Sequence, residues 1–454
     1  MSISELYTIY LRHPVVTIDS RNCPPNSLFF ALRGERFDGH AFVEQALQAG
    51  CAYAIVEDTS MAAEKKVIVV DNVLNALQQL ALTHRKTLNI PVIAITGTNG
   101  KTTTKELTAA VLSQKFNVLY THGNLNNHIG VPLTLLRLTE THEIAVIEMG
   151  ANHLGEIGDL AAIACPDYGL ITNVGYAHLE GFGSLEGVIK AKGELYDYLR
   201  ASNGTVFIHR DNELLTSIAG GIKHITYGAV ELDSRFHKTV ISGKITNLHP
   251  LLSLSWQCYP DEVHIINTKL IGGYNLWNVM AAITIGVTWG VQSEKINEAI
   301  ANYVPTNNRS QLKKTACNVL IIDTYNANPS SMRAALENFA SLIPDSQSIF
   351  SVDSPELSKK KPKAVILGDM LELGEKSLEL HTSIIEVIAS YHFEKVLLCG
   401  ENFSLTGKQY TTFPTIEQLI EYLQVSPLRG YHILIKGSHG LHLEKLIEDC
   451  RLSL

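Results

Sequence analysis

A short glycine-rich stretch carries the most specific chemistry in this sequence. Residues 96–103 read Thr-Gly-Thr-Asn-Gly-Lys-Thr-Thr, between an apolar run at 91–95 and a segment of helical periodicity at 102–115. Glycines let backbone amides close around phosphate oxygens, and the start of a helix adds positive potential. In such a loop a lysine reaches the terminal phosphates and the next hydroxyl ligates Mg²⁺. The predicted nucleotide site consists of Gly97, Thr98, Asn99, Gly100, Lys101, Thr102 and Thr103.

The stretch is a short form of the usual phosphate loop, since Ile95 stands where that pattern has a glycine. A glycine-rich turn that merely precedes a helix is the alternative interpretation. The strand before the loop and the helix after it are both predicted, and this favours the nucleotide site.

Two further apolar strands end in polar side chains that should lie near this loop. Residues 144–147 are followed by Glu148, and residues 168–172 lead into a loop that contains His178. The carboxyl ends of parallel strands line the ligand crevice of an α/β sheet, so both side chains are expected to face the phosphates. Glu148 suits a Mg²⁺ ligand or a water-orienting group. A solvated strand end and a hydrogen-bonded loop histidine are the respective alternatives.

A lysine lies on the apolar side of a predicted helix. Ser184 is the expected N-cap of a helix that runs to about residue 201, and Lys192 falls on its apolar stripe with Val188, Leu195 and Leu199. Such a lysine commonly packs its stem and keeps its ammonium in water. The alternative is a lysine aimed into a metal and phosphate site.

Two asparagines three residues apart, Asn275 and Asn278, precede an apolar helix predicted at 279–289. They are either a capping pair or amide contacts to a nucleotide base.

Composition excludes several classes of protein. The chain has 454 residues, 45% hydrophobic and 18% charged, with a net charge of −8, which suits about three soluble domains. Without a basic block, neither nucleic acid nor an anionic membrane is an expected partner. The seven cysteines are scattered without a C-x-x-C pair, as is usual for reduced thiols in the cytoplasm. A monomer is expected.

The predicted elements divide into three α/β segments, at 1–87, 88–306 and 307–454. The first has polar clusters at 19–21 and 33–40, which are either surface turns or ligand-binding loops. The second contains the phosphate loop and, over 233–270, ribbon-like strands including Val240. The third has strands at 319–322, 364–367, 396–398 and 433–435, helices at 330–342, 378–391 and 441–450, and an exposed loop at 351–363.

Together these motifs resemble the Mur ligases, and most closely the MurF type. The phosphate loop marks the superfamily, and the strings Tyr-Asn-Ala-Asn-Pro at 325–329 and Leu-Gly-Asp-Met-Leu-Glu-Leu-Gly at 367–374 point to this type. Further matching strings lie at 19–21, 28–35, 38–40, 123–127, 130–132, 148–151, 172–175, 178–180, 191–194 and 436–438, so the resemblance covers nearly the whole chain. It implies a three-domain architecture with a UDP-substrate-binding first domain, a P-loop ATP-binding central domain and a Rossmann-like C-terminal domain.

The resemblance also implies a reaction. Members of this type use ATP to join D-alanyl-D-alanine to UDP-N-acetylmuramoyl-tripeptide through an acyl phosphate, in peptidoglycan precursor synthesis. The residue that matches Lys192 is carbamylated in the family and binds a second Mg²⁺ with His178, while Glu148 and Thr102 match ligands of the first. These residues and Lys101 form the implied catalytic set. Other matches surround the ATP (Asn275, Asn278, Arg309, Asp323, Tyr325) or the substrates (Ser20, Arg21, Asn124, Asn126, Asn127, Asn326, Asn328, Lys436).

The chain departs from the family pattern at two positions. Ile322 stands where the family often has an acidic residue, and His439 replaces the arginine of a Lys-Gly-Ser-Arg string. Both departures concern contact details.

The nearest rivals are another ligase of this architecture, such as the one that adds the third amino acid, and a folylpolyglutamate synthase. The two strings at 325–329 and 367–374 argue against both. A P-loop switch protein or a small-molecule kinase would need neither Lys192 nor a third α/β segment.

Overall fold

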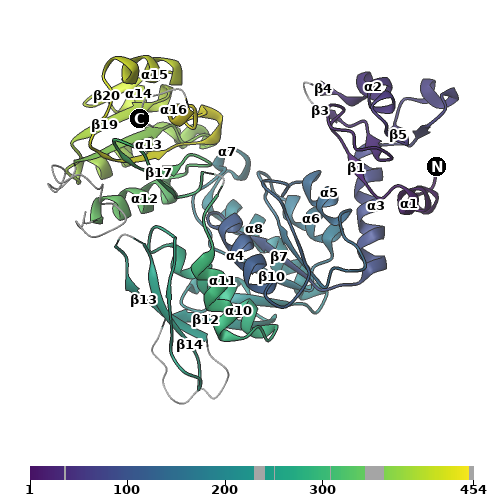
Figure 1. Cartoon of the computed structure of the whole chain (residues 1–454), viewed down its shortest axis with the longest axis horizontal. Helices are drawn as coiled ribbons and strands as arrows, with labels where there is room; N and C mark the ends of the chain where they lie inside the picture. The colour runs from purple at the N-terminus through teal and green to yellow at the C-terminus, as the bar shows by residue number, and fades with distance from the viewer. Residues whose placement is uncertain (35–36, 230–240, 250, 307, 343–361, 449–454) are drawn as a thin grey trace.

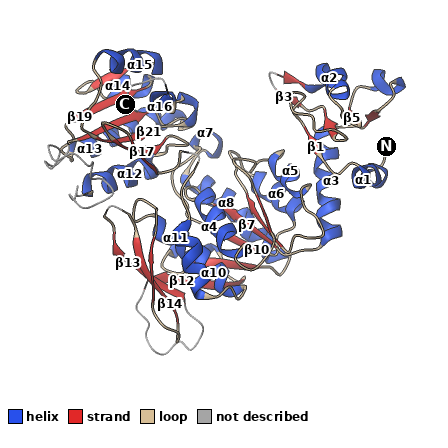
Figure 2. Cartoon of the chain, in the orientation of Figure 1, coloured by secondary structure: helices blue, strands red, loops and turns tan. Residues whose placement is uncertain are grey.

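The computed structural model contains three α/β units, with the second between the first and the third (Figure 1). It describes residues 1–34, 37–229, 241–249, 251–306, 308–342 and 362–448. Helices cover both faces of each large sheet (Figure 2). The predicted α/β architecture of three units is confirmed.

The first unit is a parallel four-stranded sheet in the order β1-β2-β5-β6, with a two-stranded ribbon, β3-β4. A capping box between Ser2 and Glu5 begins a first helix, α1, that the sequence analysis did not identify. The strands are β1 (Val16–Thr17), β2 (Leu28–Phe30), β3 (Arg33–Gly34), β4 (Phe37–Asp38), β5 (Tyr53–Val56) and β6 (Val67–Val69). The helices are α1 (Ile3–Arg12), η1 (Gly39–Phe42), α2 (Val43–Gln48), η2 (Thr59–Ala63) and α3 (Val73–Leu88).

Helix α3 connects the first unit to the second and packs against both. Leu77 and Leu80 are fully buried in a core cluster that also contains residues of the central sheet. Arg85, 4% exposed, donates hydrogen bonds to the carbonyls of Ala164 and Cys165, at 3.0 Å each. These contacts fix α3 to the C-terminal end of α6 in the second unit, since a buried guanidinium needs fixed acceptors.

The central unit is a nine-stranded sheet in the order β15-β14-β13-β12-β11-β10-β7-β9-β8. Its strands are β7 (Val92–Thr96), β8 (Val118–Tyr120), β9 (Ile144–Glu148), β10 (Tyr168–Ile171), β11 (Thr205–His209), β12 (Lys223–Ala229), β13 (Ile241–Asn247), β14 (Ser253–Cys258) and β15 (His264–Asn267). Its helices are α4 (Lys101–Leu112), α5 (Gly130–Leu135), α6 (Glu156–Ala164), α7 (Leu179–Phe182), α8 (Leu185–Ala201), α9 (Glu213–Ile218), α10 (Asn275–Thr288) and α11 (Ser293–Asn302).

Strand β7 lies inside this sheet and is buried on both faces. Val92 and Ala94 pack in the cluster that includes residues of α3, α6 and α8, whereas Ile93 and Ile95 pack in the cluster with α4 and α10. A strand covered on both faces reads as a continuous apolar run. This is why the run before the phosphate loop was recognisable in the sequence.

The third unit is a six-stranded sheet in the order β16-β17-β21-β18-β19-β20, parallel except for β16. The strands are β16 (Gln311–Lys314), β17 (Val319–Asp323), β18 (Lys363–Gly368), β19 (Lys395–Cys399), β20 (Thr411–Phe413) and β21 (His432–Lys436). The helices are α12 (Pro329–Ser341), η4 (Gly374–Lys376), α13 (Ser377–Ala389), α14 (Glu401–Thr406), α15 (Ile416–Val425), η5 (His439–Leu441) and α16 (Lys445–Glu448).

Strands β16 and β20 and helices α14 and α15 of this unit were not predicted from the sequence, and Lys363, predicted in a loop, begins β18. Within the described residues, the helix predicted at 441–450 is only the short elements η5 and α16. Glu35, Arg36, Val240, loop residues 351–361 and the end of the last predicted helix lie outside the described residues. The six cysteines that the structure describes are free, in agreement with the prediction of reduced thiols. Within the described ranges, no helix has the length and apolar character that crossing a membrane requires.

Candidate active site

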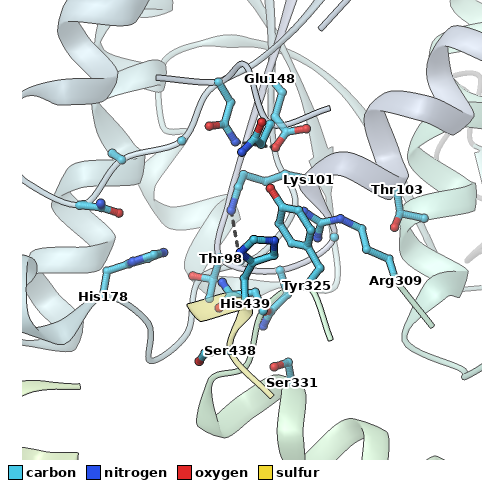
Figure 3. Close-up of a pocket in the computed structure, with 18 of the residues that line it drawn as sticks. Thr98, Lys101, Thr103, Glu148, His178, Arg309, Tyr325, Ser331, Ser438 and His439 are labelled. Carbon is cyan, nitrogen blue, oxygen red and sulfur yellow. Dashed lines mark hydrogen bonds between the residues drawn. The ribbon is translucent and has the colours of Figure 1, made fainter. Parts of the chain in front are cut away.

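A cavity of about 940 Å³ lies where the central sheet meets the third unit, and α3 reaches its edge with Leu74 and Gln78 (Figure 3). It brings together most of the predicted site residues. These are Thr98, Asn99, Gly100, Lys101, Thr103, Asn124, Asn126, Asn127, Glu148, His178, Asn275, Asn278, Arg309, Asp323, Tyr325, Asn326 and Lys436. Gly97, Thr102, Lys192 and Asn328 lie behind this lining, and Ser20 and Arg21 lie apart from it in the first unit.

The phosphate loop needs its two glycines for steric reasons. Gly97 and Gly100 have φ values of 141° and 80°. A Cβ atom on Gly100 would lie 2.5 Å from Oδ1 of Asn278, and one on Gly97 would lie 2.0 Å from Oγ1 of Thr172. Any larger residue would therefore push the loop away from both β10 and α10.

Lys101 folds back onto its own loop. Its Nζ atom donates hydrogen bonds to the carbonyls of Gly97 and Thr98, at 2.7 and 3.0 Å. Burial lowers the pKa of Lys101 to about 8, although the charge of Glu148 opposes this shift. The amine is thus held inside the loop that is predicted to surround phosphate oxygens.

Glu148 is buried in a cage of donors at the end of β9, with 1% of its surface exposed. Its Oε1 atom accepts from Thr102 Oγ1 at 3.1 Å and from Asn126 Nδ2 at 2.8 Å. Its Oε2 atom lies 3.5 Å from Nζ of Lys105, which is fully buried. The alternative of a solvated strand end is therefore wrong.

Lys105 is a residue that the sequence analysis missed. It lies one helical turn after Lys101 on α4, so the i, i+4 spacing was visible in the sequence. The partner of Lys105 was not visible, because Glu148 comes from another strand.

His178 faces the third unit. Its Nδ1 atom forms an ion pair with Oε2 of Glu372, a residue inside the string at 367–374. The amide of Glu180 also donates to the carbonyl of Glu372 at 3.2 Å. The hydrogen bond from His178 lowers the pKa of Glu372. Both partners have left-handed backbones, with φ values of 49° for His178 and 62° for Glu372.

Lys192 lies on α8, whose N-cap is Ser184 as predicted. It is 2% exposed, so the alternative of an ammonium in water is wrong. Its Nζ atom lies 3.5 Å from the carbonyl of Ala151 and 5.1 Å from the centre of the Phe182 ring. No carboxylate among the described residues forms an ion pair with it. Burial lowers the pKa of Lys192 to about 7, and the nearby charge of Lys101 acts in the same direction.

Asn275 and Asn278 are buried and do not cap α10, whose N-cap is Tyr274. Asn278 donates to Oδ1 of Asn275 at 2.8 Å and accepts from Oγ1 of Thr104 at 3.2 Å. The pair therefore joins α10 to α4, and the capping alternative is wrong. Both residues line the cavity.

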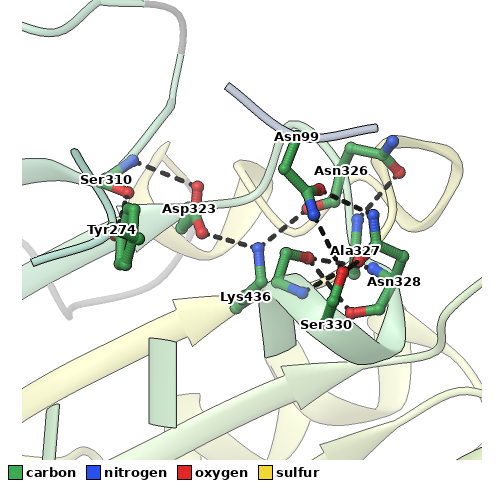
Figure 4. A network of polar contacts seen from close by, with 10 residues as sticks. Asn99, Tyr274, Ser310, Asp323, Asn326, Ala327, Asn328, Ser330 and Lys436 are labelled. Atoms are coloured by element: carbon green, nitrogen blue, oxygen red, sulfur yellow. Dashed lines mark hydrogen bonds and ion pairs between the residues drawn. The ribbon is translucent and has the colours of Figure 1, made fainter. Parts of the chain in front are cut away.

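The third unit presents polar groups from the ends of β17 and β21 (Figure 4). Lys436 donates to Oδ2 of Asp323 at 2.6 Å and to the carbonyl of Asn326 at 3.0 Å. The guanidinium of Arg309 lies 3.6 Å from the centre of the Tyr325 ring. Such stacking over an aromatic face is typical of arginine.

The two departures from the family pattern have different surroundings. Ile322 is 2% exposed and packs in the core of the third unit, so an acidic side chain there would be buried among apolar neighbours. His439 lines the cavity, with its ring centre 5.8 Å from that of Tyr325.

Several predicted substrate residues also have structural contacts. Asn127 accepts hydrogen bonds from the amides of Ile129 and Gly130 at the start of α5. Ser20 is buried, and Arg21 forms a two-point contact with Asp19, at 2.9 Å for each bond. The hydrogen bonds from Arg21 lower the pKa of Asp19 to about 2.

The described residues contain no cluster of three His, Cys, Asp or Glu side chains that could hold a metal ion by itself. The donor set nevertheless fits Mg²⁺ if oxygen ligands come from a nucleotide. Oε2 of Glu148 is buried and makes no hydrogen bond within the described structure, and Thr102 adds a hydroxyl beside it. Hard oxygen donors of this kind are what Mg²⁺ prefers, with phosphates completing the shell.

Three family models match the chain in succession. "Mur ligase family, catalytic domain" matches residues 14–85, "Mur ligase middle domain" matches 95–286, and "Mur ligase, glutamate ligase domain" matches 308–439.

Full-length relatives agree with these matches. The UDP-N-acetylmuramoyl-tripeptide–D-alanyl-D-alanine ligase of Bacillus subtilis (strain 168) is 35% identical over 96% of this chain and 93% of its own length. The Escherichia coli (strain K12) ligase of the same name is 34% identical over 95% and 92%. A crystal structure of MurF from Acinetobacter baumannii superposes with a TM-score of 0.80, at 32% identity over 96% and 92% of the two chains.

Substitution of Lys105 tests its buried ion pair with Glu148. Lys105→Met should lower the opening free energy of α4 by about 3 kcal/mol, because it leaves the Glu148 carboxylate buried without its cation. Hydrogen exchange of the α4 amides measures this change. Lys105→Met/Glu148→Gln should recover at least half of the loss, and the exposed control Lys115→Met should lose little. A Lys105→Met protein as stable as the wild type would contradict the pairing.

Proposed function

The chain belongs to the Mur ligase family, and we propose that its cavity joins D-alanyl-D-alanine to UDP-N-acetylmuramoyl-tripeptide with cleavage of ATP to ADP and phosphate. This is the reaction named for the relatives that it matches over nearly its full length. The observation that carries the proposal is the meeting of two motifs in one cavity. Phosphate-loop residues Asn99 and Lys101 lie on one side, and Tyr325 and Asn326 of the third unit lie on the other.

The ATP phosphates are proposed to bind the loop at residues 97–103. Lys101 would exchange the carbonyls of Gly97 and Thr98 for phosphate oxygens, which are stronger acceptors for an ammonium. Nε of Arg309 is buried and finds no hydrogen-bond partner among the described residues, so it has a donor available. Asn275 and Asn278 would contact the nucleotide from α10.

The ligation then proceeds in two steps. The terminal carboxylate of the tripeptide attacks the γ-phosphorus of ATP, so ADP leaves and an acyl phosphate forms. The amine of D-alanyl-D-alanine next attacks the acyl carbon, a proton leaves the nitrogen, and inorganic phosphate departs. Lys101, Arg309 and Lys436 would offset the negative charge that develops, and the packed units would exclude water.

Mg²⁺, when bound, neutralises phosphate charge and aligns the phosphates for transfer. We propose that Thr102 and Glu148 hold one ion beside the loop, and that His178 and a carbamate on Lys192 hold a second. Glu372 would keep the ring of His178 in place through Nδ1, which leaves Nε2 for the metal.

The carbamate on Lys192 is supported by burial and by the missing counter-ion. A neutral amine attacks CO₂ to give the carbamate and releases one proton. Lys192, on α8, is packed against Ala151 and Phe182. The unmodified ammonium of Lys192 would be buried without a carboxylate partner, which is costly. Conversion to a carbamate removes that unpaired positive charge.

The first unit is proposed to bind the UDP end of the substrate, with Ser20 and Arg21 among its contacts. Asn124, Asn126 and Asn127 line the cavity, and the next residue, His128, accepts a hydrogen bond from Gln78 of α3. We propose that these asparagines contact the part of the substrate between its UDP end and the phosphate loop. We also propose the three segments 1–87, 88–306 and 307–454 as the functional domains, and the cytoplasm, where nucleotide-linked precursors are available, as the location.

Phosphate release is the direct test of the proposed reaction. With ATP and UDP-N-acetylmuramoyl-tripeptide, purified protein should release phosphate only when D-alanyl-D-alanine is added. Lys101→Ala should reduce this rate by about 100-fold or more, since a charged donor to the transferring phosphate is lost. The exposed control Lys86→Ala should retain wild-type activity. Phosphate release that depends on a single amino acid, or on glutamate together with a folate, would overturn the proposed reaction.

Lys192 gives a second prediction, with a readout independent of activity. Protein equilibrated with ¹³CO₂ should show a carbamate carbon resonance by NMR that is absent from Lys192→Ala. This variant should be nearly inactive, and short carboxylic acids should restore part of its activity by supplying the missing anion. An active Mg²⁺-loaded enzyme without the resonance would refute the carbamate.

Arg21 gives a third prediction. Arg21→Ala should raise the KM for the UDP substrate by about tenfold, as expected for loss of one charge-assisted contact, while the KM for ATP stays unchanged. Arg12→Ala, an exposed arginine of α1, is the matched control. Equal KM values for both variants would make Arg21 an ordinary surface residue.

A further inference from the structure

Three side chains form a closed ring of hydrogen bonds between the phosphate loop and α12 (Figure 4). Nδ2 of Asn99 donates to Oγ of Ser330 at 2.9 Å. Oγ of Ser330 donates to Oδ1 of Asn328 at 2.8 Å. Nδ2 of Asn328 donates back to Oδ1 of Asn99 at 2.8 Å. Each residue gives one hydrogen bond and accepts one, so the bonds reinforce one another.

The central-unit side of the ring is rigid. The amide of Asn99 donates to Oδ1 of Asn173 at 3.0 Å. The carbonyl of Asn99 accepts from Oγ1 of Thr172 at 2.6 Å and from Nδ2 of Asn173 at 2.9 Å. The backbone of Asn99 is therefore fixed to the end of β10, and its side chain extends to the third unit, where it bonds to Ser330 and Asn328.

The third-unit side is equally well held. Asn328 is the N-cap of α12, and its Oδ1 atom also accepts from the amide of Ser331 at 2.9 Å. Two residues earlier, the carbonyl of Asn326 accepts from Lys436, which is itself paired with Asp323. The segment at 325–327, whose first two residues line the cavity, is thus held at Asn326 by Lys436 and at its C-terminal end by the ring.

We propose that Asn99, Asn328 and Ser330 form an interdomain clasp, whose role is to position Tyr325 and Asn326 over the phosphate loop for the ligation step. The inference rests on the proposed function. It makes the three members of the clasp positioning residues. The side chain of Asn99, next to the predicted phosphate contacts, bonds to the third unit, and the clasp itself uses no backbone amide of the loop.

Single variants can break the clasp without removing the helix cap. Asn328→Ser keeps a side-chain oxygen that can cap α12 but lacks the Nδ2 donor to Asn99. Ser330→Ala removes both bonds made by Oγ, and Asn99→Ala removes the loop partner. Ser341→Ala, at the exposed far end of α12, is the matched control. Circular dichroism verifies the fold of each protein.

Each variant is measured in three ways. The Kd for Mg²⁺–AMP-PNP by calorimetry should stay within about threefold of the wild type, because the backbone cradle is intact. The kcat for phosphate release should fall about tenfold, as expected for loss of two linked hydrogen bonds. Small-angle scattering with AMP-PNP bound should show a larger radius of gyration than the wild type. Asn99→Ala/Ser330→Ala should be no slower than the slower single variant, because the first substitution already opens the ring.

Two results would overturn the clasp. One is a kcat equal to that of Ser341→Ala in the three single variants. The other is a weaker AMP-PNP affinity in Asn99→Ala alone, together with a kcat in the double variant that falls by the product of the two single reductions. That result would mean that Asn99 contacts the nucleotide and acts independently of Ser330. The clasp and the proposed function can fail separately. If the clasp variants have larger radii of gyration but the wild-type protein does not use D-alanyl-D-alanine, the clasp is supported and the proposed function is rejected.

Discussion

The buried carboxylate of Glu148 is the interaction on which the site depends. It joins β9 to α4 through Thr102 and Lys105, and to the segment before α5 through Asn126. A carboxylate without water must be surrounded by donors, so these elements cannot shift independently. The carboxylate that links these elements is also the group that we propose to hold a metal ion beside the phosphate loop.

The cations around the cavity are also held by fixed partners. Lys101 bonds to its own loop, Lys436 to Asp323, and Arg309 stacks on Tyr325. An anionic ligand can replace the loop carbonyls that bond to Lys101. It can also bind to Lys436 and Arg309 while these keep their partners Asp323 and Tyr325. The site is therefore organised before the substrates arrive, and little reorganisation is needed when negative charge develops.

Local patterns predicted local structure well in this chain. The apolar strand before residue 96, the Ser184 cap and the inward-facing Lys192 all follow from periodicity and capping, which act over a few residues. The pairings of Lys105 with Glu148, His178 with Glu372, and Asn99 with Asn328 were not predictable, because each joins segments whose proximity only the folded chain determines. Helix α14 has only six residues and no side-chain cap, so its local signal is weak. Helix α15 did carry a signal that was not used, since Thr415 caps it and Ile416, Leu419 and Leu423 form its buried stripe.

The left-handed backbones of His178 and Glu372 have a consequence for how this protein can change. Non-glycine residues in that region carry strain of about 1 kcal/mol or more each, and glycine would relieve it. Selection for heat resistance alone would therefore favour glycine at both positions and remove the ion pair between His178 and Glu372. Where activity is selected as well, the ion pair between these side chains opposes the change, so variants selected for thermal stability alone should acquire glycine here first.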